Sequence, residues 1–174
     1  MENIKLFITD IDGVWTDGGM YYDQSGNELK KFNTSDSAGV LFLKLLNIPT
    51  AIITGENTDI VKRRAEKLQI RHVFLGVKDK VAVATDLCNR LNLDLTEVAY
   101  IGDDINDLLL LGRVGLSACP FNAPSYVKKR VDWIIPVRGG DGAFRQFVER
   151  YLERNNLLDE IVQRYLNQNS SFNQ

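Results

Sequence analysis

The sequence predicts an α/β fold in which helices pack on both faces of a mostly parallel sheet. Two observations support this class. Short apolar runs recur along the chain, as expected for parallel strands that are buried on both faces. Amphipathic stretches of helix length separate most of these runs. Such alternation is typical of a doubly wound sheet with right-handed crossovers, and 174 residues suffice for one domain of this kind.

Six apolar runs are predicted to be the strands of this sheet. Each has the length and composition of a strand that is covered on both sides. They span residues 4–9, 50–54, 72–76, 98–102, 115–119 and 132–136.

Helices are predicted between these strands. They span residues 37–47, 57–69, 79–92, 106–114 and 123–131. The first follows Ser35 and Asp36, and the second begins at Asn57 or Thr58, which are residue types that commonly cap helix N-termini. Residues 142–166 predict one or two closing helices.

Residues 14–33 interrupt the alternation of strands and helices. The turn signals Asp-Gly-Gly and Ser-Gly-Asn stand beside MYYD and ELKKF in this segment. This pattern predicts a β-hairpin that projects from the end of the first strand. We therefore expect a single domain over residues 1–166, followed by a flexible polar tail over residues 167–174.

Composition and charge exclude several classes of function. The chain is 44% hydrophobic and 25% charged, which is typical of soluble globular proteins. A net charge of −2 without a basic tract argues against nucleic acid as a partner. No apolar run approaches the roughly 20 residues that span a membrane, and Glu2 and Lys5 interrupt any secretion signal. Cys88 and Cys119 match no zinc or disulfide pattern, so we expect a reducing, cytoplasmic setting.

Chemically reactive residues follow several of the predicted strands. Asp10 and Asp12 follow the first strand, Thr54 and Gly55 end the second, and Lys80 opens the helix after the third. Gly102, Asp103 and Asp104 come at the end of the fourth. In open α/β sheets, ligands bind outside the carboxyl ends of the strands. The topology therefore predicts that these residues converge on one crevice.

The acids among these residues predict a metal site. Asp10 and Asp12 are two positions apart on an extended chain, so they point to the same side, where Asp103 or Asp107 would join them. Such a group of carboxylates needs a cation, most naturally Mg²⁺, which also binds substrate phosphate. Lys80 and the Thr54 hydroxyl could then hold phosphoryl oxygens.

No Ser-His-Asp set is available to supply a nucleophile, because His72 is the only histidine and stands at a strand start. The nucleophile is therefore a carboxylate or a metal-bound water.

Four short stretches form a recognisable pattern: DIDG at 10–13, TG at 54–55, the lysine at 80 and GDDIND at 102–107. In order and spacing they resemble the four motifs of the haloacid dehalogenase superfamily of phosphohydrolases. The resemblance implies that Asp10 is the nucleophile, which forms an aspartyl-phosphate. Asp12 protonates the leaving alcohol and then deprotonates the attacking water, which favours a phosphatase over a dehalogenase. Thr54 and Lys80 stabilise the phosphoryl group and the nucleophile.

The same resemblance implies the ligands of Mg²⁺. Asp103 would bind it together with Asp10 and the backbone carbonyl of Asp12, with Asp104 or Asp107 in support.

A narrower resemblance covers residues 4–151. The stretches that carry it are DGVWTDGG, FNTSDSAG, ITGENT, GVKDK and RGGDGAFR. In these stretches the chain is similar to the small capless phosphatases of 2-keto-3-deoxy sugar acid biosynthesis. These act on 3-deoxy-manno-octulosonate 8-phosphate or on keto-deoxy-nonulosonate 9-phosphate. Members are homotetramers in which the hairpin helps assembly and a neighbouring subunit roofs the active site. No insertion in this chain is long enough to form a separate cap domain.

Three residues bear on the choice of substrate. Octulosonate phosphatases usually carry Arg at the position of Glu56, and often an acid at the position of Lys67. With Arg64, these residues resemble the nonulosonate branch, and the eight-carbon sugar acid and N-acylneuraminate 9-phosphate are the alternatives. Arg64 suits a sugar-acid carboxylate, Glu56 can accept hydrogen bonds from hydroxyls, and Lys67 lies one turn beyond Arg64. Ordinary ion pairs on a solvated helix would give the same pattern.

Other candidates for substrate binding are Gly55, Thr34, Ser35, Asp36 and Arg138. Residues 34–36 would line the site, unless Asp36 is only a helix cap. Arg138 precedes two glycines, in either a plain turn or a loop that meets a neighbour's substrate.

Two other functions are compatible with parts of the pattern. A signalling receiver also combines acids, a threonine and a lysine in a doubly wound domain, but its acceptor aspartate stands on a different strand from the acidic pair. A tetrameric scaffold that has lost activity would be expected to lack some motif residues, and all are present here.

Overall fold

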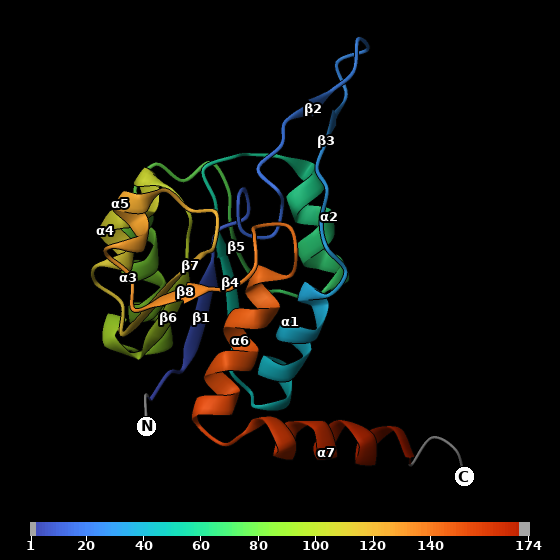
Figure 1. Ribbon diagram of the computed structural model, residues 1–174, viewed down its shortest axis with the longest axis vertical. Coiled ribbons are helices and arrows are strands. Elements are labelled where there is room, and N and C mark those ends of the chain that lie inside the picture. Colours follow the sequence, from blue (N-terminus) through green and yellow to red (C-terminus); the bar gives the residue numbers. More distant parts are fainter. Residues whose placement is uncertain (1–2, 171–174) are drawn as a thin grey trace.

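The sheet is parallel and six-stranded, and helices cover both of its faces (Figure 1). The computed structural model describes residues 3–170, with the side chains of residues 3–167. The strand order is β5-β4-β1-β6-β7-β8. The bounds are β1 Leu6–Thr9, β4 Thr50–Ile53, β5 His72–Phe74, β6 Val98–Ile101, β7 Leu116–Pro120 and β8 Trp133–Ile135. All six predicted strands are confirmed, and so is the fold class.

The helices form two layers. One layer holds α1 (Asp36–Leu45), α2 (Asp59–Lys67) and α6 (Ala143–Arg154), and the other holds α3 (Lys80–Leu91), α4 (Leu108–Leu111) and α5 (Ser125–Lys128) (Figure 1). Two short 3₁₀ turns, η1 (Leu95–Glu97) and η2 (Ile105–Asp107), flank β6. The helix expected over residues 106–114 is therefore only a 3₁₀ turn followed by one helical turn, which ends at Gly112.

Each layer encloses its own hydrophobic core because successive side chains of a strand point to opposite faces. Phe7 of β1 packs on Phe147 of α6, with their ring centroids 5.4 Å apart. The next residue, Ile8, belongs to the core on the other face together with Leu87 of α3. The four central strands, β4, β1, β6 and β7, are thus buried on both sides, which explains their continuous apolar composition.

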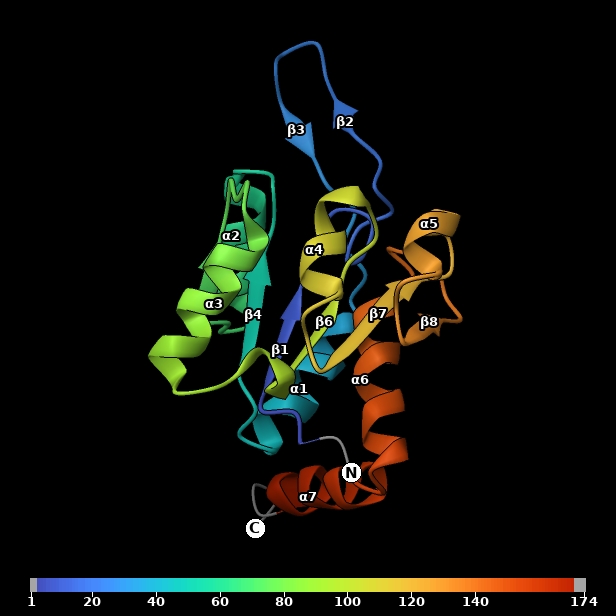
Figure 2. The same cartoon turned by 90° about the vertical axis from the view of Figure 1, so that its left-hand side faces the viewer.

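The predicted hairpin is present and projects away from the sheet (Figure 2). Its strands, β2 (Tyr21–Tyr22) and β3 (Glu28–Leu29), pair antiparallel, and a bridge between Thr16 and Phe32 closes its base. The side chains of Met20, Tyr22 and Leu29 are at least half exposed along it.

The C-terminal segment corrects one expectation. Helix α7 runs over Leu158–Ser170, so residues 167–170 are helical rather than a flexible tail, and residues 171–174 lie outside the described part of the chain. The helix is anchored because Ile161 is fully buried and the Arg164 guanidinium donates to the carbonyl of Leu45 in α1 (3.2 Å). Once its first turns are anchored, the helix propagates into polar sequence at little further cost.

The cap predictions hold only in part. Ser35 and Thr58 occupy the N-cap positions of α1 and α2, but neither side chain accepts a capping hydrogen bond. Asp36 is the first residue of α1, and it caps a different helix, as described below. Within the described residues, no helix combines the length and apolarity that crossing a membrane requires.

Candidate active site

The predicted crevice exists at the carboxyl ends of the central strands. A cavity of about 260 Å³ opens there, and its lining includes Asp10, Asp12, Thr54, Asp103 and Glu56. Strand β1 has β4 on one side and β6 on the other, so the chain changes direction across the sheet at this point. This is the position at which open α/β sheets bind their ligands. The remaining lining residues are Gly13, Gly18, Gly55, Asp104 and Asn106.

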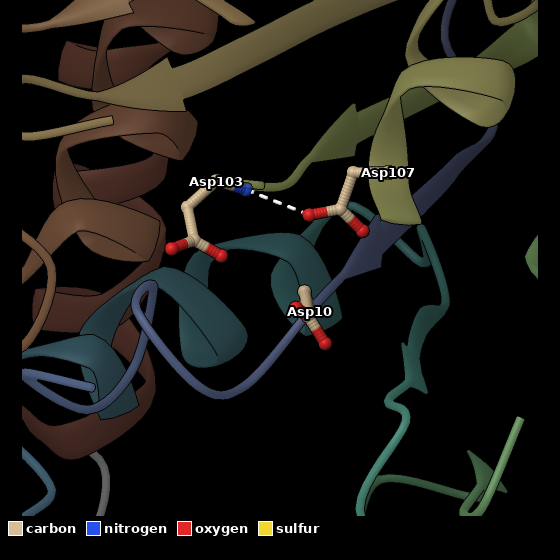
Figure 3. A group of neighbouring side chains, drawn as sticks. All are labelled: Asp10, Asp103 and Asp107. Carbon is tan, nitrogen blue, oxygen red and sulfur yellow. Dashed lines mark hydrogen bonds between the residues drawn. The ribbon is translucent and has the colours of Figure 1, made fainter. Parts of the chain in front are cut away.

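Three carboxylates lie together at one side of this cavity (Figure 3). Oxygens of Asp10, Asp103 and Asp107 all fall within 4.8 Å of one another. Gly13 makes room for them: its φ is +81°, and a Cβ there would lie 1.9 Å from Oδ2 of Asp103. A larger residue at position 13 would therefore displace the carboxylate.

Lys80 joins two of these acids. Its side chain is 2% exposed, and its Nζ lies 3.0 Å from Oδ1 of Asp10 and 2.6 Å from Oδ1 of Asp107. Burial lowers the pKa of Lys80, but the charges of Asp10 and Asp107 outweigh this and raise it overall. The lysine is therefore a permanent positive charge beside the Asp10 carboxylate.

Both oxygens of Asp107 are occupied by protein groups. Its Oδ1 accepts a hydrogen bond from the hydroxyl of Tyr100 (2.5 Å), in addition to that from Lys80. Its Oδ2 accepts the backbone N–H groups of Asp103 (2.8 Å) and Asp104 (3.1 Å), the first of which is drawn in Figure 3. Asp107 thus orients the lysine and the loop that carries Asp103.

The other two acids are in an environment that calls for a cation. Burial, assisted by the charge of Asp107, raises the pKa of Asp10 to about 7 against the opposing effect of Lys80. Burial, together with the charges of Asp10 and Asp107, raises the pKa of Asp103 to about 8. A cation between these carboxylates would offset both effects, and oxygen ligands of this kind fit Mg²⁺.

Asp12 is held through one of its two oxygens. Oδ1 accepts hydrogen bonds from Nζ of Lys30 (2.8 Å) and from the hydroxyl of Thr16 (3.2 Å). Oδ2 is buried without a hydrogen-bond partner among the described residues. The contacts to Oδ1 therefore fix the orientation of the Asp12 carboxyl group at the cavity.

Four side chains at this site were not among the residues expected from the sequence. Lys30 lies in a hairpin segment without a local signal, Thr16 stands in a turn, and Tyr100 falls in a strand that indicated only core packing. Asn106 lies within GDDIND, and its position between acids at a strand end could have marked it.

Several predicted substrate residues lie outside the lining of this cavity. They are Arg64, Lys67, Thr34, Ser35, Asp36 and Arg138. The Arg64 guanidinium lies near the rings of Trp15 (6.0 Å) and Phe32 (5.8 Å), and it donates to the carbonyl of Asn33 and the hydroxyl of Ser37. Within one chain, Arg64 therefore fastens α2 to the base of the hairpin.

Asp36 and Arg138 also have structural surroundings. The fully buried Asp36 accepts the N–H of Arg145 (3.0 Å) at the start of α6, and burial raises its pKa to about 6. Arg138 is exposed. The loop after it supports the loop that follows Asp12, because the N–H of Gly140 donates to the carbonyl of Val14 (3.0 Å).

Comparisons with known proteins agree with this geometry. The family described as haloacid dehalogenase-like hydrolase matches residues 51–146. The 3-deoxy-D-manno-octulosonate 8-phosphate phosphatase KdsC of Haemophilus influenzae is 39% identical over 153 residues, which are 88% of this chain and 85% of the relative.

Solved structures of similar proteins cover nearly the whole chain. A probable YrbI family phosphatase from Pseudomonas syringae is 42% identical, with a TM-score of 0.91 over 95% of this chain and 94% of the other. The 3-deoxy-D-manno-octulosonate 8-phosphate phosphatase of Moraxella catarrhalis, in complex with a magnesium ion, a phosphate ion and KDO, is 35% identical, with a TM-score of 0.90 over 94% of both chains. Together with the motif residues gathered around one cavity, these matches show that the chain belongs to the haloacid dehalogenase-like hydrolases.

Proposed function

We propose that this protein is a Mg²⁺-dependent phosphatase that hydrolyses the phosphomonoester of a 2-keto-3-deoxy sugar acid. The observation that carries the proposal is that Asp10, Asp12, Thr54, Lys80 and Asp103 meet at one cavity. Relatives that align with most of the chain are named as sugar-acid phosphatases, which supports the substrate class.

The chemistry follows from the positions of the side chains. Asp10 attacks phosphorus while the bond to the sugar oxygen breaks, and Asp12 gives a proton to that oxygen. Water then attacks the aspartyl-phosphate and gives a proton to Asp12, which releases inorganic phosphate and restores Asp10. Thr54 and Lys80 hold the phosphoryl oxygens during both steps.

Mg²⁺ fits the acidic end of the cavity. Asp10, Asp103 and the backbone carbonyl of Asp12 would hold the ion, while Asp104 and Asp107 orient the loop around it. When bound, it supplies positive charge that neutralises the phosphoryl oxygens.

The first candidate substrate is 3-deoxy-manno-octulosonate 8-phosphate, because the curated relatives that align with most of the chain act, by their names, on this compound. The second is keto-deoxy-nonulosonate 9-phosphate, or the related N-acylneuraminate 9-phosphate. Its support is Glu56, an acid that lines the cavity beside Asp10 and Asp12 and favours the nine-carbon branch.

We also propose that the protein is a homotetramer whose neighbouring subunits roof the cavity. Two features support this assembly. The hairpin exposes Met20, Tyr21, Tyr22 and Leu29. In addition, no cap domain is inserted among the described residues, so the cavity has no roof of its own chain. Arg64, Lys67 and Arg138 would then act in an assembled site, and a cytoplasmic location stays a prediction.

Phosphate release from purified protein with Mg²⁺ tests the proposal, with the eight-carbon and nine-carbon phosphates assayed side by side. We expect rapid release from at least one of them and none with Asp10→Asn, and chelation of Mg²⁺ should stop it reversibly. Faster release from the nine-carbon phosphate would select the second candidate. Release from neither, with good turnover of unrelated sugar phosphates, would contradict the substrate class.

A further inference from the structure

The hairpin places a buried lysine against the acid–base carboxyl of the site. Lys30 directly follows β3, whose two residues are partly or fully exposed. The side chain of Lys30, in contrast, is only 1% exposed. Its Nζ lies 2.8 Å from Oδ1 of Asp12 and 3.5 Å from Oε1 of Glu28. The neighbouring Lys31 is 63% exposed, so burial is specific to Lys30 and is not a property of the segment.

The surroundings of Lys30 are acidic. Asp12, Glu28 and Glu56 all act on it electrostatically, and Asp12 is the acid with which it forms its hydrogen bond. A buried ammonium group is costly unless carboxylates compensate it. Solvation of the ammonium group would favour an exposed side chain. The interaction with Asp12 explains why the Lys30 side chain is buried instead.

The two oxygens of Asp12 differ as a result. Oδ1 is occupied by Lys30 and by the hydroxyl of Thr16, whereas Oδ2 has no hydrogen-bond partner among the described residues. A carboxyl group that accepts hydrogen bonds through one oxygen cannot rotate freely, so its other oxygen keeps a constant direction. Asp12 also lines the cavity in which the ester would bind.

We propose that Lys30 is a positioning residue, which with Thr16 holds Oδ1 of Asp12 and so fixes the orientation of the carboxyl group that exchanges the proton with the substrate. This inference rests on the proposed phosphatase function and deepens it. As the phosphorus–oxygen bond of the ester breaks, the proton moves from the Asp12 carboxyl group to the leaving oxygen. When water attacks the aspartyl-phosphate, its proton returns to the Asp12 carboxylate, while Lys30 donates the same hydrogen bond throughout and neither gains nor loses a proton.

The arrangement also couples the hairpin to the chemistry. The chain leaves the site at Gly13, and the bridge between Thr16 and Phe32 sets the separation of the two hairpin arms at their base. Lys30 stands two residues before that bridge, so the shape of the hairpin determines how far its ammonium group reaches. A distortion of the hairpin should therefore impair proton transfer before it impairs binding of the phosphate.

The dependence of the rate on the leaving group tests this role. A sugar alcohol must receive a proton as it leaves, whereas p-nitrophenolate leaves without one. The assay measures kcat/KM with p-nitrophenyl phosphate and with the sugar-acid phosphate that the wild type hydrolyses best. For Lys30→Met, we expect about a hundredfold loss with the sugar phosphate, in the range typical of general acid catalysis, and less than about a threefold loss with p-nitrophenyl phosphate.

Three further variants complete the design. Asp12→Asn should show the same selectivity for the sugar phosphate, and Lys31→Met, the exposed neighbour, should change neither rate. Lys30→Ala also removes the hydrogen-bond donor and takes the place of Lys30→Met if the methionine variant does not fold. The p-nitrophenyl phosphate rate itself reports an intact phosphoryl-transfer site.

The outcomes separate this inference from the function on which it rests. An equal loss with both esters, or no loss with either, would overturn the positioning role while leaving the phosphatase function standing. A wild type that releases no phosphate from either ester would overturn the proposed function and this inference together.

Discussion

Asp10 and Asp103 are the carboxyl groups whose ionisation should depend most on a bound cation. Burial is the first cause of the raised pKa in both, and neighbouring acids add to it. Without a divalent ion these groups retain protons at pH values at which an unfolded chain would have lost them. Metal binding and proton release are therefore linked at this site.

This linkage predicts how stability depends on pH. Because the folded-state pKa values, about 7 and about 8, lie above the ordinary 3.8, ionisation of Asp10 and Asp103 costs stability. In EDTA, their contribution to the unfolding free energy should decline as pH rises from about 4 to 8, by an amount on the order of a few kcal/mol. Mg²⁺ should offset the decline, so urea unfolding with Mg²⁺ and with EDTA should differ more at pH 8 than at pH 5.

Asp103→Asn provides the control, because it removes one of the two acids. The stabilisation by Mg²⁺ at pH 8 should shrink in this variant. A stabilisation that is equal at both pH values in the wild type would contradict the linkage.

Glu56 is the residue whose replacement should change the choice of substrate. It is exposed and lines the cavity, where it would meet the sugar rather than the phosphate. Glu56→Arg reverses the charge at this point, so we expect the ratio of kcat/KM for the nine-carbon over the eight-carbon phosphate to fall by about tenfold or more. Steady-state phosphate release measures both rates.

The matched control is Glu66→Arg, which makes the same change of charge at an exposed position of α2 outside the cavity lining. It should leave the ratio unchanged. If Glu56→Arg also leaves it unchanged, then Glu56 does not select the sugar.

A buried carboxyl of α1 caps the start of α6, beside the apolar contacts between the two helices. Asp36 is the first residue of α1, and its Oδ1 accepts the N–H of Arg145 in the first turn of α6. This contact satisfies one of the donors that a helix leaves unpaired at its N-terminus. Its Oδ2 is buried without a hydrogen-bond partner among the described residues, so ionisation of this group is costly.

Asp36→Asn tests this link between the helices. The pKa of Asp36, about 6 in the folded protein and raised mainly by burial, lies above the ordinary 3.8. Stability from the neutral form is therefore lost as pH rises from about 4 through 6. The asparagine variant keeps the acceptor without the charge. The difference in unfolding free energy between variant and wild type should therefore be larger at pH 8 than at pH 4, in favour of the variant, by roughly 1–3 kcal/mol.

Urea unfolding at both pH values measures this difference. A constant offset between variant and wild type at pH 4 and pH 8 would show that Asp36 does not titrate in this range.

The hairpin projects from the end of the sheet that holds the cavity (Figure 1), and it carries several exposed apolar side chains. Tyr22 is 67% exposed and Leu29 63%. Apolar surface of this kind on a projecting element favours contact with another chain.

If the hairpin assembles the tetramer, then Tyr22→Lys combined with Leu29→Lys should lower the mass in solution from four chains toward one. Light scattering after gel filtration measures the mass, and circular dichroism checks the fold. Ile134→Lys changes a side chain that is 42% exposed on β8, away from the hairpin, and should leave the mass unaltered. A wild type that elutes as a monomer would contradict the assembly.

Local patterns were enough to place the strands. Each predicted strand is present within two residues of its expected ends, because the central strands, which are buried on both faces, must be apolar throughout. The short helices were predicted less well. Gly112 ends α4 early and Pro124 precedes a single turn of α5, so both helices are shorter than expected from the apolar pattern.

The residues of the candidate catalytic site could also be predicted from the sequence, but their supporting contacts could not. Asp10, Thr54 and Asp103 follow strands that are neighbours in the sheet, so any parallel arrangement brings them together. Lys30 carries no such signal, because its position depends on how the hairpin folds back. For Arg64 the sequence predicts a place near the substrate, which stays a prediction, whereas its contacts that fasten α2 to the hairpin base within one chain were not predicted.

The sequence by itself therefore established the sheet, the acidic site at the carboxyl ends of its central strands and the class of chemistry, because strand composition and the spacing of acids are local properties. Folding in three dimensions was needed to assign partners. The hydrogen bonds of Lys30 to Asp12, Lys80 to Asp107 and Arg145 to Asp36 join residues 18, 27 and 109 positions apart. Contacts over such separations depend on how whole elements pack, and no local pattern encodes them.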